Sequence, residues 1–259
     1  PEILNLGLPS ETASGLSEEG HAGGAFPRPD VHERLARVLS RLKPDLILAC
    51  YGMNDGIYFP LEESRFAKFR DGMRRLHEAA AHEGVRVIHL TPPVFDSQPL
   101  KGRTLPAGLK AYPQPFEGYD EVLSAYSQWL VAQRLNGWQV VDVHGPMREF
   151  LNAQRSQNPA FTLSGDGVHA NRQGHWLMAR EALRAMGAQG AWMEFATPDE
   201  LLRLSQNPAD PWALIQRRQR VLKDAALTYA GHQRPGMSAG KPWEEAQSEA
   251  REIQRRLNP

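Results

Sequence analysis

Apolar residues in this chain fall either in short continuous runs or in stripes at helical spacing. The runs within 44–50, 85–90 and 138–143 are bounded by turn-forming or polar residues, which is typical of strands buried on both faces of a parallel sheet. The stripes predict helices; they are Val31, Leu35, Val38, Leu39 and Leu42; Phe66, Phe69, Met73 and Leu76; Val122, Leu123, Tyr126, Trp129 and Leu130; and Trp176, Leu177 and Leu183. This alternation predicts an α/β fold with helices on both faces of the sheet.

After residue 190 the pattern predicts helices only. A capping box at Thr197-Pro198-Asp199-Glu200 opens one helix, Asp210-Pro211 opens a second, and Pro242 precedes a third. The expected apolar faces are Trp212, Ile215, Leu222 and Tyr229 in the second helix, and Trp243, Ala246, Ala250, Ile253 and Leu257 in the third. We therefore expect an α/β domain over 1–190 and a helical extension over 191–259 that packs on it. The alternative role of these helices is contact within a homo-oligomer.

Composition excludes several classes of function. Thirty basic and thirty acidic side chains cancel, so charge gives no reason to expect binding to nucleic acid. The single cysteine cannot form an internal disulfide. The apolar runs are far shorter than the roughly 20 residues that a membrane-spanning helix needs. No signal peptide is recognisable, and the compartment stays open.

The loop Ser164-Gly165-Asp166-Gly167-Val168-His169-Ala170-Asn171 carries the strongest chemical signal. Asp166 lies three residues before His169, with glycines on both sides of the aspartate. A carboxylate held against an imidazole fixes its tautomer and stabilises the imidazolium that forms when the histidine takes a proton. The alternative is purely structural, with His169 and Asp166 serving as loop and helix caps.

Two further motifs follow expected strand ends. Tyr51-Gly52-Met53-Asn54-Asp55 comes directly after the run at 44–50, where open α/β sheets place their ligands, and the Asn54 amide could donate to an oxyanion. Ile3-Leu4-Asn5-Leu6-Gly7 indicates a strand that ends in a glycine, whose N–H could approach a ligand closely. The alternatives are an ordinary turn and an ordinary strand-ending glycine.

Taken in this order, the three motifs resemble those of the SGNH (GDSL-type) hydrolases, over roughly residues 1–187. The resemblance implies a flavodoxin-like, three-layer α/β/α sandwich and a serine esterase that works through an acyl-enzyme. It implies that Asp166 and His169 are triad members and that Gly7 and Asn54 are oxyanion donors. It implies no cofactor and no metal.

The Gly-Asp-Ser block that carries the nucleophile in this family does not occur in the sequence. Ser164 lies on the wrong element, Ser10 and Ser14 lie on no strand-to-helix elbow, and Cys50 lies within a strand pattern. We therefore expect the chain to lack the first strand with its serine, which is a central strand in this family. Its absence would leave two neighbouring strands with unpaired backbone groups, so either an upstream segment completes the sheet or the chain is a poorly stable, inactive remnant.

Two long irregular segments, 10–30 and 92–118, are expected to form the walls of the substrate pocket. The expected substrate contacts are Asp55, Phe95 and Tyr112, with Phe116 and Tyr119 as further stacking surfaces. His232 and Arg234 are expected to be surface residues, with a place on the pocket rim as the alternative. Aromatic and polar loops favour a small acyl group, such as acetyl, on a carbohydrate or related polyol.

Three rival functions remain open at this stage. The first is a lipase or lysophospholipase, although no long apolar lid is recognisable. The second is a metal-dependent hydrolase that uses pairs such as Asp30/His32, Asp142/His144 or Asp166/His169. The third is a catalytically incomplete carbohydrate-binding relative.

Overall fold

The computed structural model describes residues 2–204 and 211–257 and is built around a parallel sheet. The strands are β1 (Leu46–Cys50), β2 (Arg86–Leu90) and β3 (Gln139–Val141), in the order β1-β2-β3. Ile47 pairs with Val87, and Ile88 pairs with Gln139. The three predicted apolar runs are thus confirmed as neighbouring parallel strands.

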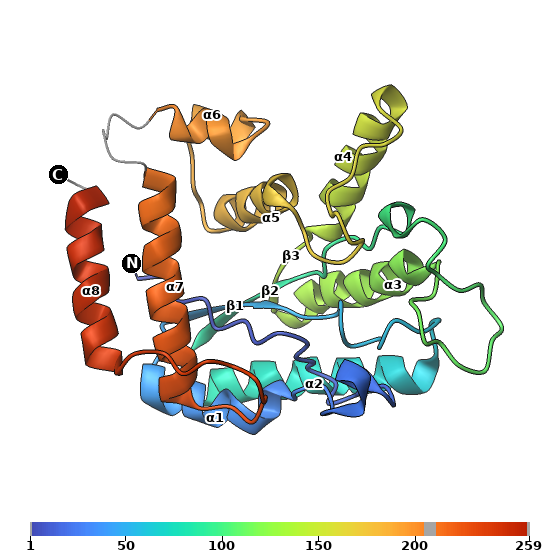
Figure 1. Cartoon of the computed structure of the whole chain (residues 1–259), viewed down its shortest axis with the longest axis horizontal. Coiled ribbons are helices and arrows are strands. Elements are labelled where there is room, and N and C mark those ends of the chain that lie inside the picture. The colour runs from blue at the N-terminus through green and yellow to red at the C-terminus, as the bar shows by residue number, and fades with distance from the viewer. Residues whose placement is uncertain (1, 205–210, 258–259) are drawn as a thin grey trace.

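Eight α-helices surround the sheet in the described part of the chain (Figure 1). They are α1 (Val31–Leu42), α2 (Glu63–His82), α3 (Tyr119–Ala132), α4 (His144–Gln157), α5 (Arg172–Ala185), α6 (Pro198–Leu202), α7 (Pro211–Ala230) and α8 (Trp243–Leu257). Each helix expected from its apolar stripe is present. Helix α4 was not expected, because it buries only His144, Met147 and Leu151 and so shows little periodicity.

The two faces of the sheet contact different helices, which makes the fold a three-layer α/β/α sandwich. On one face, Ala49, Val87 and Val140 pack in a core with residues of α1, α2 and α3. On the other face, Ile88 and Leu90 of β2 and Val141 of β3 pack with Ala182 of α5. Neighbouring strand residues point to opposite faces, so these apolar strands supply both cores at once.

The expected strand at residues 3–6 is wrong, because residues 2–8 form no regular secondary structure. Side chains rather than a neighbouring strand hold this segment. The Asn5 carboxamide oxygen accepts the Gly7 N–H at 2.9 Å, and the Leu6 carbonyl accepts a hydrogen bond from Arg34 at 2.8 Å.

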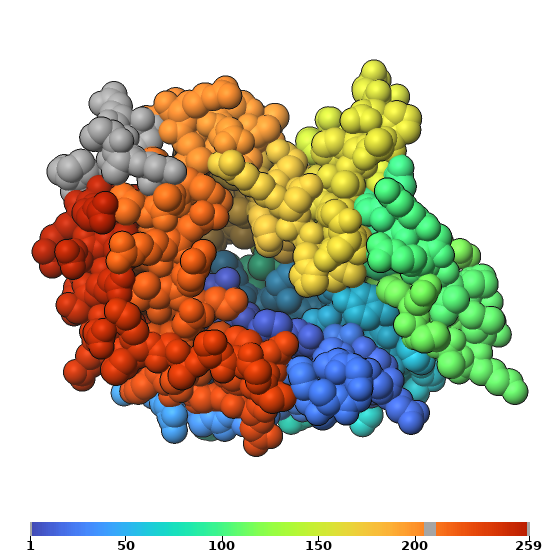
Figure 2. Space-filling model, viewed as in Figure 1, coloured from blue at the N-terminus to red at the C-terminus, as the bar shows by residue number. Residues whose placement is uncertain are grey.

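Strand β1 keeps an open edge in the described part of the chain, since its one ladder partner there is β2. Leu48 is 44% exposed, although its register partner Ile88 is 1% exposed. Cys50, expected to be buried, is exposed beside the same edge. Figure 2 shows the surface hollowed between α5 (yellow) and α7 (orange), above the N-terminal segment (blue).

Helices α7 and α8 lie side by side, and α7 contacts α1 (Figure 1). Arg37 and Arg41 of α1 donate to carbonyls in the last turn of α7, Arg37 to Ala230 at 3.0 Å and Arg41 to Tyr229 at 2.8 Å. These cations complement the negative end of the α7 dipole. The arrangement gives a helical extension on an α/β core, and the division at residue 190 stays a prediction.

The detailed expectations for the extension are met in part. The capping box is present, with the Thr197 N–H donating to Glu200 at 3.1 Å. Ala246, Ala250 and Ile253 of α8 are buried as expected. In α7, Leu222 is buried as expected, but Ile215 and Tyr229 are exposed, at 38% and 41%. The other buried residues of α7 are Leu214, Ala225, Ala226, Leu227 and Ala230. Asp210 lies outside the described residues.

Among the described helices, none combines the length and apolar character needed to cross a bilayer.

Candidate active site

Asp166 and His169 are in direct contact on the surface of the molecule. The His169 Nδ1 and the Asp166 Oδ2 lie 2.7 Å apart. The His169 side chain is 85% exposed and that of Asp166 is 58% exposed. The same carboxylate accepts the backbone N–H groups of Val168 and His169 through Oδ1, so the short loop closes on itself. One edge of the imidazole is therefore fixed, and the other faces open space.

The charge of Asp166 is stabilised by its neighbours. Partial burial by itself would raise the pKa of Asp166, but hydrogen bonds from the His169 side chain, the loop N–H groups and the Ser164 hydroxyl outweigh it. The pKa of Asp166 consequently lies well below its ordinary value. The Ser164 Oγ is 3.0 Å from Asp166 Oδ1, so this serine supports the aspartate.

A buried carboxylate anchors the Asp166–His169 loop to the core. Asp96 is nearly buried, and its Oδ2 accepts hydrogen bonds from Arg155 at 2.6 Å and from Thr162 at 2.8 Å. Its backbone N–H also donates to the Gly167 carbonyl at 2.9 Å. These contacts fix the start and the middle of the loop, which explains how an exposed pair of side chains can hold a defined geometry.

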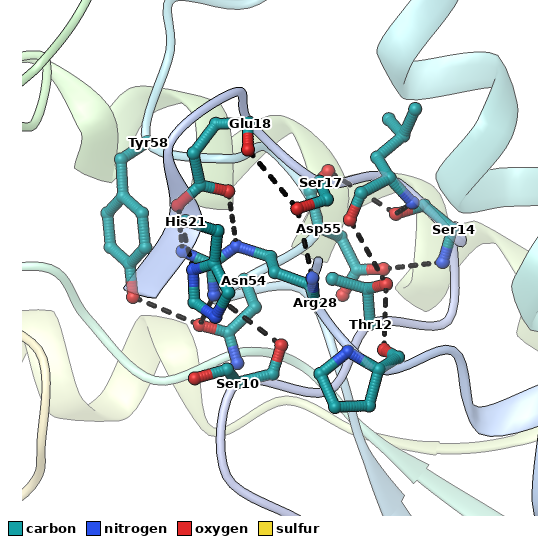
Figure 3. Close-up of polar contacts among 12 residues, drawn as sticks. Ser10, Thr12, Ser14, Ser17, Glu18, His21, Arg28, Asn54, Asp55 and Tyr58 are labelled. Carbon is teal, nitrogen blue, oxygen red and sulfur yellow. Dashed lines mark hydrogen bonds and ion pairs between the residues drawn. The ribbon is translucent and has the colours of Figure 1, made fainter. Parts of the chain in front are cut away.

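Asn54 follows β1 in a loop, and its side chain is oriented by two donors. Its Oδ1 accepts from Arg28 at 3.0 Å and from the Tyr58 hydroxyl at 3.1 Å (Figure 3). The Asn54 Nδ2 donates one hydrogen to the Glu11 carbonyl at 3.2 Å. Two donors on one atom of the carboxamide identify that atom as oxygen and make the other a nitrogen donor.

Arg28 reaches Asn54 from the 10–30 segment, and sequence reasoning did not single it out. Its guanidinium is nearly buried and pairs with Glu18 through two contacts, of 2.6 and 2.7 Å (Figure 3). Burial alone would raise the pKa of Glu18, but the Arg28 pairing outweighs it and lowers that pKa. The long loop therefore builds a rigid charged support beside Asn54.

Tyr58 links Asn54 to the Asp166–His169 loop. Burial raises the pKa of Tyr58 to about 12, and the negative charge of Asp166 contributes to the rise. The phenol therefore stays protonated and can donate to Asn54. Val168 and Tyr58 pack against the same apolar cluster. The structure thus brings the motif at residues 51–55 and the Asp166–His169 loop to one region of the surface.

Gly7, the expected oxyanion donor, is placed elsewhere. It is exposed, and its N–H is used by the Asn5 side chain. Ser10 lies next to Asn54 and Arg28 instead (Figure 3). Ser10 occupies the left-handed region with a φ of 66°, where a side chain costs roughly 1–2 kcal/mol. Backbone strain of this kind concentrates at functional sites.

The turn that contains Ser10 could have been found in the sequence. Residues 8–11 form a tight turn in which the Glu11 N–H donates to the Leu8 carbonyl at 3.2 Å. Pro9 occupies the first central position and Ser10, with positive φ, the second, which is the arrangement of a type II turn. Arg34 and Tyr51 hold the last residue of this turn, because both donate hydrogen bonds to the Glu11 carboxylate, at 2.6 and 2.7 Å.

Asp55, expected to contact substrate, is instead fully buried. Its carboxylate accepts the N–H groups of Ala13, Ser14 and Gly52 at 2.7–2.8 Å. Burial raises the pKa of Asp55 in opposition to these hydrogen bonds. The side chain ties the 10–30 segment to the loop after β1, and no part of it is open to a ligand.

Replacing Asp55 by alanine is expected to destabilise the fold strongly. Three N–H groups in or near the core would lose their acceptor, which costs on the order of 3–9 kcal/mol at about 1–3 kcal/mol for each group. Urea denaturation measures the change. Asp71→Ala, an exposed acid on α2, is the matched control and should change stability by less than about 0.5 kcal/mol. Equal effects of the two substitutions would contradict the assignment.

Helix α2 touches this same segment through a glycine. A Cβ atom added at Gly72 would lie 1.9 Å from the Ala13 carbonyl oxygen. Only a residue without a side chain allows the helix to approach so closely. The N–H of Ala13 is one of those that Asp55 holds.

The aromatic residues expected in the pocket have different surroundings. Phe95 and Tyr119 are buried, and their rings pack edge to face 5.5 Å apart, so both support the core rather than a ligand. The Tyr119 hydroxyl donates to the Met53 carbonyl at 2.8 Å. Tyr112 is half-buried and packs between Phe59 and Phe116, with ring centroids at 5.2 and 6.2 Å.

Residues named for the metal alternative are engaged in other contacts. Asp30 caps α1 by accepting the His32 N–H at 2.9 Å, and Asp142 accepts the Gly145 N–H at 3.1 Å. Within residues 2–204 and 211–257, no three His, Cys, Asp or Glu side chains are grouped so that they could hold a metal ion. His232 and Arg234 lie half-buried in the loop between α7 and α8.

Comparison with known proteins defines the class. The GDSL-like Lipase/Acylhydrolase family matches residues 2–177, and the chain belongs to this family. By its description, this is a family of lipases and acylhydrolases. No curated protein is similar enough in sequence to count as a match.

Several solved structures are similar at low identity. A gut microbial diltiazem-metabolizing enzyme is 20% identical with a TM-score of 0.47, over 61% of this chain and 37% of that one. A catalytic mutant of Axe2, an acetylxylan esterase from Geobacillus stearothermophilus, is 17% identical with a TM-score of 0.45, over 61% of this chain and 67% of that one. The chain thus spans a little over a third of the first protein and two thirds of the second.

Proposed function

We propose that this chain provides the general base, its orienting acid and the oxyanion donors of a serine esterase. The observation that carries the proposal is the 2.7 Å contact between Asp166 and an imidazole whose far edge is open to solvent. An ionised carboxylate can only accept, so His169 Nδ1 must carry the hydrogen. The Nε2 lone pair then faces outward and is available as a base.

The chemistry follows from this tautomer. His169 Nε2 takes the proton of a serine hydroxyl as the serine oxygen attacks the ester carbonyl carbon. The imidazolium that forms is stabilised by Asp166 and gives the proton to the leaving alcohol, which leaves an acyl-enzyme. Water then repeats the sequence with His169 as base, which releases the acid and restores the serine.

The oxyanion would be stabilised by the Asn54 Nδ2 and the Ser10 N–H. Arg28 and Tyr58 hold the Asn54 oxygen, which turns the amide nitrogen away from them. The Ser10 N–H replaces that of Gly7 in this proposal, because the turn brings Ser10 beside Asn54. Donors fixed before the reaction need no reorganisation as charge develops, which is the main source of their catalytic effect.

The nucleophile is proposed to come from a segment other than residues 1–259, paired with the open edge of β1. A parallel strand on that edge would end beside Asn54, at the carboxyl end of the sheet, where α/β folds bind ligands. It would also cover Leu48, which is now exposed. Ser164 is unsuited, since its hydroxyl donates to Asp166. We call this chain together with that segment the complete enzyme.

A small acyl group on a carbohydrate or related polyol is the proposed substrate. The half-buried aromatic cluster of Phe59, Tyr112 and Phe116 offers faces on which a sugar ring could stack. The Phe116 N–H donates to the Tyr58 carbonyl at 2.9 Å, which links this cluster to the Asn54 region. A comparison of kcat/KM for acetyl and long-chain esters of one alcohol distinguishes this substrate from a lipid ester.

Fluorophosphonate labelling, read by intact mass and peptide mapping, tests the function. The probe is applied to the 259-residue chain, to the full product of its reading frame, and to both carrying His169→Ala. Labelling of a serine outside residues 1–259 that depends on His169 would support the proposal. Labelling of a serine within the chain would keep the esterase but change the nucleophile. If neither protein reacts and chelators have no effect, a binding protein is the better description.

A further inference from the structure

The loop between α7 and α8 reaches back to the turn that contains Ser10. The Arg234 Nε donates to the Pro9 carbonyl oxygen at 3.0 Å, across 225 residues of sequence. The Arg234 guanidinium also lies over the Phe26 ring, 5.2 Å from its centroid. The helical extension therefore touches the backbone of the proposed oxyanion site through one side chain.

The Pro9 carbonyl and the Ser10 N–H belong to the same peptide group. In a planar trans peptide these two groups point in opposite directions. A donor that fixes the carbonyl on one side therefore aims the N–H toward the other. We propose that Arg234 is a positioning residue that keeps the Ser10 N–H directed at the oxyanion. The inference rests on the proposed function, in which that N–H is an oxyanion donor.

This peptide group has two accessible orientations. Type I and type II turns differ mainly by a flip of their central peptide, and type II requires a positive φ at the second central residue. Glycine adopts that φ freely, whereas serine is strained there. Ser10 has the positive φ, so something outside the turn must favour this orientation. The hydrogen bond from Arg234 to the Pro9 oxygen favours this orientation, because a flip of the peptide would break it.

The other contacts near the turn do not fix this peptide. Arg28 lies 3.5 Å from the Ser10 carbonyl, which belongs to the next peptide group. Arg34 holds the Leu6 carbonyl and the Glu11 side chain, on either side of the turn. The orientation of the central peptide therefore depends on a residue of the extension, which gives the C-terminal helices a part in catalysis.

A double-substitution experiment on the complete enzyme tests the inference. Arg234→Met keeps most of the apolar length of the side chain but cannot donate to Pro9. It should lower kcat at least about tenfold, toward the 10²–10³ expected for loss of one oxyanion donor, with little change in KM. The same substitution in the Ser10→Gly background should lower kcat less than about threefold, because glycine keeps the positive φ without help.

The outcomes separate positioning from simple stabilisation. A general structural role of Arg234 would lower activity equally in both backgrounds, and that result would overturn the proposal, as would full activity of Arg234→Met. Arg220→Met, an exposed arginine of α7, is the matched control for loss of a cation from the extension.

A second measurement does not depend on catalysis. The isotope-labelled 259-residue chain can be studied by NMR. In it, the nuclear Overhauser effect between Pro9 Hα and the Ser10 amide proton should be strong, because a type II turn brings these protons close together. It should weaken in Arg234→Met and return in the double variant. An unchanged effect in Arg234→Met would refute the inference. A changed effect in a protein whose complete form shows no esterase activity would instead refute the proposed function.

Discussion

His169→Ala should remove nearly all turnover of the complete enzyme. Loss of the base in a serine triad lowers kcat by a factor on the order of 10⁴–10⁶. Because the His169 side chain is 85% exposed, its removal should leave the fold and its unfolding temperature almost unchanged. Steady-state kinetics with a small aryl acetate, together with thermal unfolding, measures both quantities.

His82→Ala is the matched control for this substitution. The His82 side chain is also 85% exposed and also lies beside a carboxylate, that of Glu83, but it sits at the end of α2. The two variants should differ in activity and agree in stability. Comparable activity of both would mean that His169 is a surface residue like any other.

The pH profile gives an independent check on the same assignment. Activity should fall at acid pH, because protonated His169 cannot take a proton from the serine. The pKa of Asp166 lies well below its ordinary value, so its carboxylate stays ionised throughout that fall. On the acid side of the profile, activity should therefore decline with the slope expected for the binding of a single proton. A two-proton slope would indicate that Asp166 does not stay ionised.

Asn54→Asp should lower kcat of the complete enzyme by at least the 10²–10³ that is typical of a lost oxyanion donor. The aspartate has the same shape and still accepts from Arg28 and Tyr58, so these two contacts survive, whereas the hydrogen bond from the amide nitrogen to the Glu11 carbonyl is lost. It replaces the donating amide by a second oxygen and brings negative charge to the place where negative charge develops. KM should change much less than kcat, because the interaction forms in the transition state.

Asn54→Ala separates loss of the donor from added charge. It should lose turnover in the same 10²–10³ range without electrostatic repulsion. Asn152→Ala, at an exposed position of α4, is the control and should retain full activity. If Asn54→Ala retained full activity, the oxyanion assignment would be wrong.

The sequence predicted those parts of the fold whose signals are local. The apolar stripe from Val31 to Leu42 matches α1 in both bounds, and the capping box at Thr197 is present. The Asp166–His169 contact was also within reach, since three intervening positions bring the two side chains together in one loop. The motif at residues 51–55 placed Asn54 correctly after β1, but the amide orientation depends on Arg28 and Tyr58.

The parts that sequence reasoning missed depend on burial and on long-range contacts. Asp55 and Phe95 look like ligand contacts as residue types, yet both are buried. Asp55 holds the backbone of the 10–30 segment, and Phe95 packs against the rings of Tyr58 and Tyr119. Residues 3–6 have strand composition but no strand partner. Arg234 meets Pro9 across 225 residues, and no spacing rule predicts such a pairing.

Gly72 has a consequence for protein engineering. In the middle of an exposed helix, Gly→Ala is a standard stabilising change worth about 0.5–1 kcal/mol. At position 72 the added methyl would collide with the Ala13 carbonyl, 1.9 Å away. The displaced segment leads directly to Asp55 and from there to the Asn54 loop. A design procedure guided by helix propensity alone would therefore select a substitution that disturbs the proposed esterase site through Ala13 and Asp55.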